Sequence, residues 1–366
     1  MKVLIDFSPI KTGGGAQLAL NFLNYIQKID MNFCILVSDK FPYIDRVASN
    51  TELIVSPSNY ARRIFFENVT IKNEVESRGV THIYTFFGPG LPVIKGVKQV
   101  VSVAYPIICN DESPYWKYIP KFEYLKKKAI NYFRKKRLSR ADFLLFETEV
   151  MQKRCVSVLN YDIDKTKVIP PSPTGFLKET NKKNNNNITR FLLLTGLDYH
   201  KNIWRLVQVL PLIYRNGLDV KFVISCERDD FYNKYNAHIR SIETHLVDKY
   251  FDFRGKVSSD QIQSIYDDVD VMLNISDLES FSNNYMESWR ARKPILASDT
   301  DFSRYICDGS AIYVNPHDLD ELCDKISMFV DSKLDIESML VVGDQRLAFL
   351  PTLDERLRFI REVMFS

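Results

Sequence analysis

Short apolar runs recur along the whole chain, and a polar turn or a helical stretch separates each run from the next. Runs of this kind, rich in Val, Ile, Leu and Phe, are typical of strands buried on both faces of a parallel sheet. Strands that alternate with helices predict an α/β fold in which crossover helices cover the sheet. We predict strands at residues 2–7, 33–37, 53–55, 82–87, 100–104, 141–146, 190–195, 220–225, 250–254, 271–275, 295–298 and 312–314.

The alternating pattern is interrupted between the sixth and seventh of these strands. Several prolines at 170–173 stop regular structure, and the polar sequence NKKNNNN at 181–187 cannot build a hydrophobic core. A chain of 366 residues is also too long for one typical core. We therefore expect two domains joined by a hinge. The predicted boundaries are a first domain at 1–172, a linker at 173–189, a second domain at 190–350 and a terminal segment at 351–366.

The first predicted strand leads into a glycine-rich turn and then into a helical pattern. Gly14 and Gly15 lie in this turn. A strand, a glycine turn and a helix begin a doubly wound sheet, and glycine allows the backbone to approach a ligand closely. Because three consecutive glycines are not the G-x-G-x-x-G fingerprint, a plain flexible turn is an equal alternative.

Residues 270–299, DVMLNISDLESFSNNYMESWRARKPILASD, carry the most informative chemistry. A predicted strand is followed by a polar turn, a short helix at 283–292 and a second strand. Glu279 falls in the turn at the carboxyl end of the first strand, and Glu287 lies about one turn inside the helix. The alternative is that both glutamates belong to a solvated helix start.

The start of this short helix is also a predicted anion site. Ser282 and Asn283 are good N-cap residues. The backbone N–H groups of Ser282, Asn283 and Asn284 would point into one space, where a helix N-terminus attracts anions. Carboxylates beside an anion site suit a ligand that carries both hydroxyl and phosphate groups, such as a nucleotide sugar.

The second half of the chain begins with a strand, the loop GLDYHKN at 196–202 and an amphipathic helix. Lys201 stands where a strand-to-helix loop presents an ammonium group to phosphate. An ordinary surface lysine is the alternative.

The sequence ESFSNNYMESWRARKPILASD resembles the donor-binding segment of the family-four retaining glycosyltransferases, which have the GT-B fold. This resemblance implies two Rossmann-like domains that face each other across a cleft, with a terminal helix that crosses back to the first domain. The apolar face of residues 353–365 fits that helix. The resemblance also implies that Glu279 contacts the sugar hydroxyls, that Lys201 and the amides from Asn283 to Tyr285 contact the diphosphate, and that Glu287 contacts the ribose.

The chain departs from the family pattern near these residues. Arg290 and Arg292 stand where the family usually has Ala and Gly. Gly196 occupies the expected place of a phosphate-binding arginine. Arg205 and Arg228 are the candidates to replace that arginine, and the sequence does not choose between them.

A further departure lies on the acceptor side. Tyr105 follows the strand at 100–104, where the family commonly has a histidine that faces the sugar. A tyrosine can hydrogen-bond a sugar hydroxyl, but it does not exchange a proton near pH 7 as histidine does.

Charge is concentrated in residues 115–140, YWKYIPKFEYLKKKAINYFRKKRLSR. This run holds ten Lys or Arg and one Glu, a net charge of +9, whereas the whole chain carries +3 and the remainder therefore −6. A basic helix with interleaved aromatics suits an anionic membrane surface. A solvated face packed on the sheet and a nucleic-acid surface are the alternatives, and we expect no nucleic acid.

The remaining composition narrows the class of protein. No apolar run approaches the roughly 18 residues of a membrane span, and the first residues show no signal peptide. The six scattered cysteines predict reduced thiols, and the five histidines lack metal-ligand spacing. We expect a cytoplasmic protein, peripheral on the inner face of the plasma membrane, that needs no metal or other cofactor.

Together these features predict a retaining, metal-independent glycosyltransferase that uses a nucleoside-diphosphate sugar, with a UDP-sugar favoured. The expected acceptor is a glycan or a polyprenyl-linked glycan in surface polysaccharide assembly. Two alternatives remain: a GT-B nucleotide-sugar epimerase, and a nucleotide-sugar-binding protein whose catalytic site is disabled by Arg290 and Arg292 and by the missing phosphate arginine.

Overall fold

The computed structural model describes the chain except for residues 11–13, 30, 174–176, 180–187, 259 and 366. Much of the predicted linker, including NKKNNNN, lies outside the described residues. The chain divides into two compact units: residues 1–111, 120–171 and 352–366 form the first, and residues 112–119 and 172–351 form the second.

The first unit is built on a parallel sheet of seven strands in the order β3-β2-β1-β4-β5-β6-β7. The strands are β1 (Val3–Asp6), β2 (Phe33–Ser38), β3 (Glu52–Ser56), β4 (His82–Thr85), β5 (Lys98–Val103), β6 (Phe143–Phe146) and β7 (Thr166–Val168). Its helices are α1 (Gly14–Ile26), α2 (Tyr60–Phe65), α3 (Ile71–Ser77), α5 (Lys121–Leu138), α6 (Glu149–Leu159) and α15 (Leu353–Phe365). A π-helical turn, Phe66–Thr70, joins α2 to α3, and short 3-10 turns lie at Ile44–Arg46, Pro106–Ile108 and Ile163–Lys165.

The second unit has a parallel sheet of six strands in the order β10-β9-β8-β11-β12-β13. The strands are β8 (Thr189–Leu193), β9 (Val220–Ile224), β10 (Phe251–Phe253), β11 (Val271–Asn274), β12 (Ile295–Ser298) and β13 (Ala311–Val314). The helices are α4 (Tyr115–Tyr118), α7 (Ile203–Arg215), α8 (Arg228–Ile239), α9 (His245–Tyr250), α10 (Ile262–Asp267), α11 (Asn283–Arg290), α12 (Asp301–Cys307), α13 (Leu319–Val330) and α14 (Ile336–Ala348), with 3-10 turns at Tyr199–Lys201 and Asp308–Ser310.

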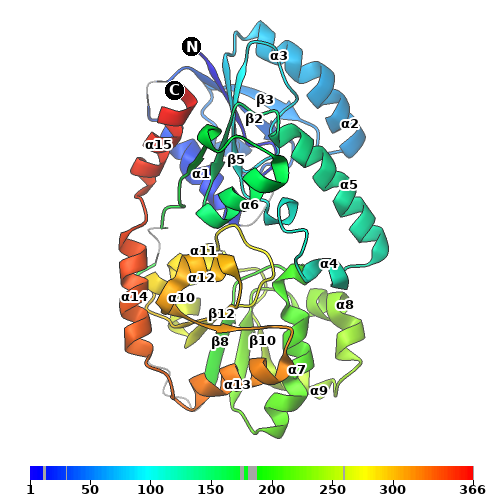
Figure 1. Cartoon of the computed structure of the whole chain (residues 1–366), viewed down its shortest axis with the longest axis vertical. Helices are drawn as coiled ribbons and strands as arrows, with labels where there is room; N and C mark the ends of the chain where they lie inside the picture. The colour runs from blue at the N-terminus through cyan, green and yellow to red at the C-terminus, as the bar shows by residue number, and fades with distance from the viewer. Residues whose placement is uncertain (11–13, 30, 174–176, 180–187, 259, 366) are drawn as a thin grey trace. The chain divides into compact units, whose positions relative to one another are not determined.

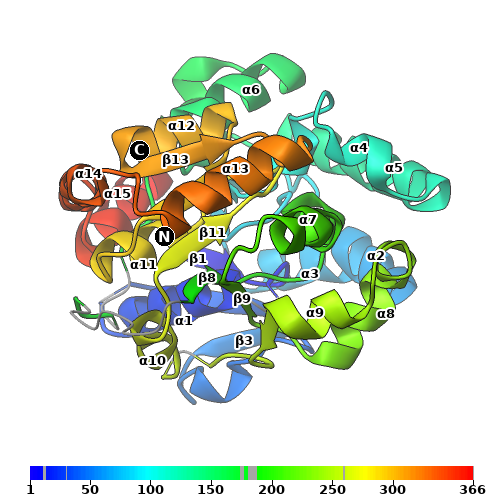
Figure 2. The same ribbon diagram turned by 90° about the horizontal axis from the view of Figure 1, so that it is seen from below.

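Both sheets are covered on two faces, as the short apolar runs predicted. In β8, Phe191 and Leu193 face the core that also holds α7, α8, α9 and α13, whereas Leu192 faces the core with α10. Figure 2 shows α7 and α13 side by side over this sheet. The alternation of the two faces follows from the two-residue period of a strand.

The terminal helix α15 packs on the first unit, as the resemblance implied. Leu357, Ile360, Val363 and Met364 are buried in the same core as residues of α1 and β1. Figure 1 shows α15, in red, beside α1, in blue. The apolar face predicted from the sequence is therefore the buried face of this helix.

The basic run at 115–140 is not one helix. Ile119 has an extended backbone (φ −85°, ψ 147°) before Pro120, which separates α4 from α5. The residue before a proline is disfavoured in the helical region, because its backbone clashes with the proline ring. Tyr115 and Trp116 are buried, so these two aromatics are not part of an exposed basic surface.

Candidate functional site

The carboxyl ends of β8 and β11 bring Lys201 and Glu279 together. These strands are neighbours in the sheet, and the loop that follows each strand carries one of the two residues. The Lys201 Nζ lies 2.5 Å from Glu279 Oε1, and the side chains are 19% and 13% exposed. Neighbouring parallel strands end at the same edge of the sheet, which is where open α/β sheets bind ligands. Both residues were candidates from sequence, but their direct contact was not predicted.

The loop after Glu279 leads into α11 through Ser282. Ser282 is the N-cap by its backbone (φ −91°, ψ 122°), although its side chain makes no capping hydrogen bond. The side chain of Asn284 donates to the carbonyl of Leu194 at 2.8 Å, which ties the start of α11 to the end of β8. The helix start therefore lies at the same edge as Lys201, and Asn283 opens it.

Tyr285 is turned away from this edge. Its side chain is fully buried, and its hydroxyl lies 3.1 Å from Ser303 Oγ in α12. Its amide N–H donates to the carbonyl of Ser282 at 3.1 Å. The Tyr285 amide is thus already used by a hydrogen bond within the helix start, and this bond competes with the predicted contact to the diphosphate.

Glu287 lies one turn inside α11, where burial controls its ionisation. Desolvation raises the pKa of Glu287 from 4.5 to about 7, and a hydrogen bond from the Tyr266 hydroxyl to Oε2 at 3.5 Å opposes that rise. The same hydroxyl lies 3.4 Å from the carbonyl of Asn284. Glu287 is thus a half-buried acceptor that changes charge near neutral pH.

A buried aspartate that the sequence reading missed joins the two loops. Asp277 Oδ1 accepts from Asn202 Nδ2 at 2.7 Å and lies 2.8 Å from His317 Nε2. The Asp277 N–H donates to the carbonyl of His200 at 2.7 Å. Asn202 follows Lys201, and Asp277 precedes Glu279 by two residues. Their closeness in sequence to these predicted site residues was the one signal that could have identified them. His317 follows β13, far along the chain, and gave no such signal.

Comparison with known proteins gives a family match for part of the chain and a fold match for all of it. Residues 189–332 match the family model described as Glycosyl transferases group 1. This part of the chain, which carries Lys201, Glu279 and Glu287, is therefore similar to glycosyltransferases of that family. No curated protein sequence matches the chain.

Solved structures resemble the whole chain, including the part outside residues 189–332. A glycosyltransferase from Rickettsia africae ESF-5 is 15% identical, with 99% of this chain and 97% of that chain covered and a TM-score of 0.70. HepE from Anabaena in complex with UDP and glucose is 13% identical, with 100% of both chains covered and a TM-score of 0.72. WaaG, a glycosyltransferase involved in lipopolysaccharide biosynthesis, is 12% identical, with 100% of both chains covered and a TM-score of 0.71. The chain has the GT-B fold.

The two candidate phosphate arginines, Arg205 and Arg228, differ in placement. The Arg205 guanidinium lies 3.9 Å from the Trp204 ring centre and 4.8 Å from that of Tyr118, and its Nη2 lies 2.9 Å from His317 Nδ1. Arg205 is thus linked through His317 to Asp277. Arg228 instead pairs with Asp248 at 2.7 Å on the surface, where both side chains are 53% exposed.

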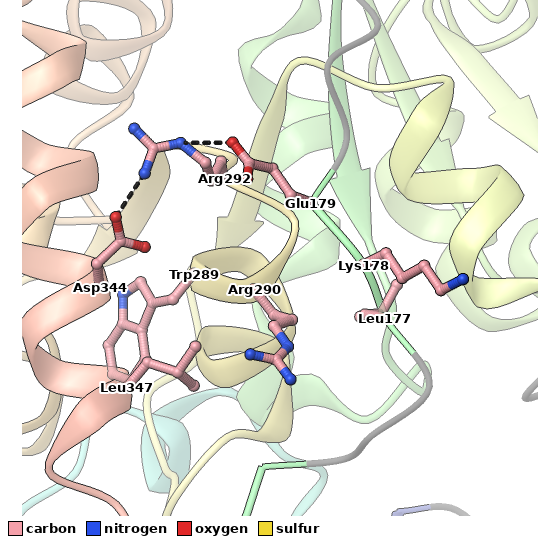
Figure 3. Close-up of a pocket in the computed structure, with 8 residues that line it drawn as sticks. All are labelled: Leu177, Lys178, Glu179, Trp289, Arg290, Arg292, Asp344 and Leu347. Carbon is pink, nitrogen blue, oxygen red and sulfur yellow. Dashed lines mark hydrogen bonds and ion pairs between the residues drawn. The ribbon is translucent and has the colours of Figure 1, made fainter.

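Arg290 and Arg292 lie at the opposite end of α11 from Ser282. They line a pocket of about 400 Å³ with Leu177, Lys178, Glu179, Trp289, Asp344 and Leu347 (Figure 3). Arg292 has a left-handed backbone (φ +51°), the conformation that favours the glycine usual in the family. Its guanidinium is paired with Asp344 at 2.5 Å, Glu337 at 2.9 Å and Glu179 at 3.3 Å. Both arginines are therefore removed from the start of α11.

The candidates of the first unit lie at the carboxyl end of its own sheet. Gly14 and Gly15 open α1 after β1. A Cβ atom at Gly15 would lie 3.8 Å from Ile10 Cδ1 and 3.9 Å from Phe87 Cδ2, so crowding does not require a glycine there. Tyr105 follows β5, and the Arg134 guanidinium lies 4.3 Å from the centre of its ring.

The described residues contain no group of three or more His, Cys, Asp or Glu arranged to hold a metal ion. All six cysteines are free and buried. Among the described residues, no helix is both long enough and apolar enough to span a bilayer.

Proposed function

We propose that the protein is a retaining, metal-independent glycosyltransferase that moves a sugar from a nucleoside diphosphate, with UDP favoured, to a glycan or lipid-linked glycan of a surface polysaccharide. The observation that carries this proposal is the contact between Lys201 and Glu279 at the carboxyl ends of β8 and β11. A cation can bind the charged phosphates of a sugar diphosphate, and a neighbouring carboxylate can accept hydrogen bonds from the hydroxyl groups of its sugar.

Each residue has a role that its surroundings support. Lys201 would leave Glu279 to neutralise the charge that grows on the leaving diphosphate, and preorganised charge of this kind is often worth several kcal/mol. Glu279, released by Lys201, would accept hydrogen bonds from sugar hydroxyls. The amides of Asn283 and Asn284, at the start of α11 and at the same sheet edge as Lys201, would donate to the diphosphate, and Glu287 would accept from the ribose.

The choice of donor is supported by a structural neighbour. HepE has been solved with UDP, with UDP and glucose, and with UDP-glucose. HepE covers the whole of this chain at 13% identity, so its UDP sugar is the first donor to test.

The proposal is tested by separating binding from turnover. Lys201→Ala should weaken UDP binding about tenfold or more, because a phosphate contact is lost, and tenfold equals about 1.4 kcal/mol. Glu279→Ala should bind UDP at least as tightly as the wild type, because the competitor for Lys201 is gone, while turnover falls about 100-fold. Isothermal calorimetry with UDP and a product assay with UDP-sugars would measure the two effects.

Lys333→Ala is the matched control, since it breaks an exposed ion pair with Asp331 in the same unit. It should change neither UDP affinity nor turnover. Unchanged transfer in both Lys201→Ala and Glu279→Ala would refute the placement of the site. The anomeric configuration of the product, read by NMR, tests retention, and product formed from donor alone would indicate an epimerase.

A further inference from the structure

The first unit holds a cluster of arginines that the donor site does not use. Helix α5 is fixed against the turn after β5, because buried Asn131 donates from Nδ2 to the carbonyl of Ile107 at 3.2 Å. One turn later on the same helix, Arg134 lies over the ring of Tyr105. Arg134 therefore faces the carboxyl edge of the first sheet, whereas other residues of α5, such as Phe122 and Lys126, are exposed.

The carboxylates near this edge are bound by groups other than Arg134. Glu67 is 6% exposed and is bound by Arg63 Nε at 2.6 Å and by Arg137 Nη2 at 2.6 Å. Asp6 is buried at the end of β1, and its two oxygens accept from the Ser8 N–H at 2.9 Å and the Thr85 hydroxyl at 3.1 Å. Within the described part of the chain, no carboxylate oxygen lies within 4.0 Å of the Arg134 guanidinium.

The electrostatics of this cluster favour an added anion. Burial lowers the pKa of Arg134, and the positive charge of nearby Arg63 lowers it further, while Tyr105 opposes both effects. Burial also raises the pKa of Asp6, while the positive charge of Arg63 opposes that rise. Arg63 is compensated by its ion pair with Glu67, whereas Arg134 is a half-buried cation without a carboxylate partner among the described residues, and an anionic ligand would relieve the cost of burying it.

We propose that Arg134 and Arg63, with the Tyr105 hydroxyl, form a site in the first unit for a phosphate group of the acceptor. The inference rests on the proposed glycosyltransferase function and names the chemistry of its acceptor, a phosphate ester. Two guanidinium groups present planar pairs of donors that match phosphate oxygens, and stacking on Tyr105 holds one of them in place. The ester belongs either to a lipid phosphate or to a soluble sugar phosphate.

The test titrates phosphate compounds onto the full chain while UDP is kept saturating, so that phosphate does not report on Lys201. The probes are inorganic phosphate, glucose 6-phosphate, and neutral phosphatidylcholine vesicles with and without dodecyl phosphate. Arg134→Gln should weaken binding of inorganic phosphate at least tenfold. Arg134→Lys should lie between this variant and the wild type, because it keeps the charge without the planar donors.

Arg62→Gln is the matched control, since Arg62 is exposed and immediately precedes Arg63 in α2. It should bind phosphate within twofold of the wild type, and UDP affinity should be equal in all variants, which also reports correct folding. Stronger Arg134-dependent binding of dodecyl phosphate vesicles than of glucose 6-phosphate would assign the site to a lipid phosphate, and the reverse to a soluble ester.

Phosphate binding that is equal in the wild type and in Arg134→Gln would overturn the proposal, as would no phosphate binding by a wild type that binds UDP. Failure of the wild type to bind UDP would instead refute the donor site. In that case the Arg134 dependence of phosphate binding still decides whether this anion site exists.

Discussion

At the scale of single residues, the burial of Glu287 links its protonation to the stability of the fold. Burial raises its pKa from 4.5 to about 7, so the folded state holds this proton at pH values where the unfolded chain has lost it. The stabilisation from Glu287 is therefore complete below pH 4.5, decreases as the pH rises, and is lost above about pH 7. A shift of this size corresponds to roughly 3 kcal/mol at most.

We expect Glu287→Gln to remove this pH dependence. The free energy of unfolding in urea, measured from pH 5 to pH 8, should fall more steeply for the wild type than for Glu287→Gln. UDP affinity of the wild type should rise over the same range, because the ionised carboxylate is the better acceptor for ribose hydroxyls. Glu362→Gln, at an exposed glutamate of α15, is the control and should follow the wild type. Parallel stability curves for the wild type and Glu287→Gln would contradict the prediction.

At the scale of elements, His317 in the loop after β13 is linked to Asp277 in the loop after β11 and to Arg205 in α7. Nδ1 faces the Arg205 guanidinium, which only donates, and Nε2 faces the Asp277 carboxylate, which accepts. The neutral imidazole with its proton on Nε2 satisfies both partners. Asp277 and Asn202 then hold the loops that carry Glu279 and Lys201 at the positions observed.

We expect His317 to act as a positioning residue, with glutamine as its conservative replacement. His317→Gln can donate to Asp277 and accept from Arg205, so kcat/KM should stay within a few-fold of the wild type. His317→Leu leaves the buried Asp277 short of a donor, which costs about 1–3 kcal/mol. Its kcat/KM for a UDP-sugar should fall about tenfold or more. Equal kcat/KM for the Leu and Gln variants would show that the hydrogen bonds of His317 do not position the loops.

At the scale of the whole molecule, the basic run at 115–140 is divided between the two units: α4 belongs to the second and α5 to the first. Tyr115 and Trp116 are buried in the second unit, whereas Phe122, Leu125, Tyr132 and Phe133 are 79%, 66%, 63% and 59% exposed on α5. Two lysines of α5, Lys128 and Lys135, are paired with Asp111. The exposed aromatics of this run that an anionic membrane could contact therefore lie mainly on α5, and Lys117 and Tyr118 of α4 are exposed as well.

We predict peripheral, salt-sensitive binding of α5 to anionic vesicles. Each lysine near an anionic surface contributes about 1 kcal/mol. Co-sedimentation with phosphatidylglycerol vesicles should fall strongly when exposed Lys121, Lys126 and Lys136 are changed to Glu. The same change at exposed Lys249, Lys256 and Lys333 of the second unit alters the net charge equally and should have little effect. Equal sedimentation of both triple variants would contradict the prediction.

The sequence by itself determined the local elements and the fold class. Short apolar runs predicted the parallel strands, because a strand buried on both faces is apolar at most of its positions. The apolar face of residues 353–365 predicted a docked terminal helix, and α15 is buried on that face. The positions of Glu279, Glu287 and Lys201 after strands or near a helix start were also readable, since these depend on neighbours in the sequence.

Only the tertiary structure decided which of these residues meet. Lys201 and Glu279 are separated by 78 residues, and they touch because β8 and β11 are neighbours in the sheet. The partners of His317, Arg205 and Arg292 follow in the same way from how the loops and helices pack. A periodic pattern reports which face of an element is buried but not which distant element covers it. For that reason the strands could be predicted, whereas the contacts between their loops could not.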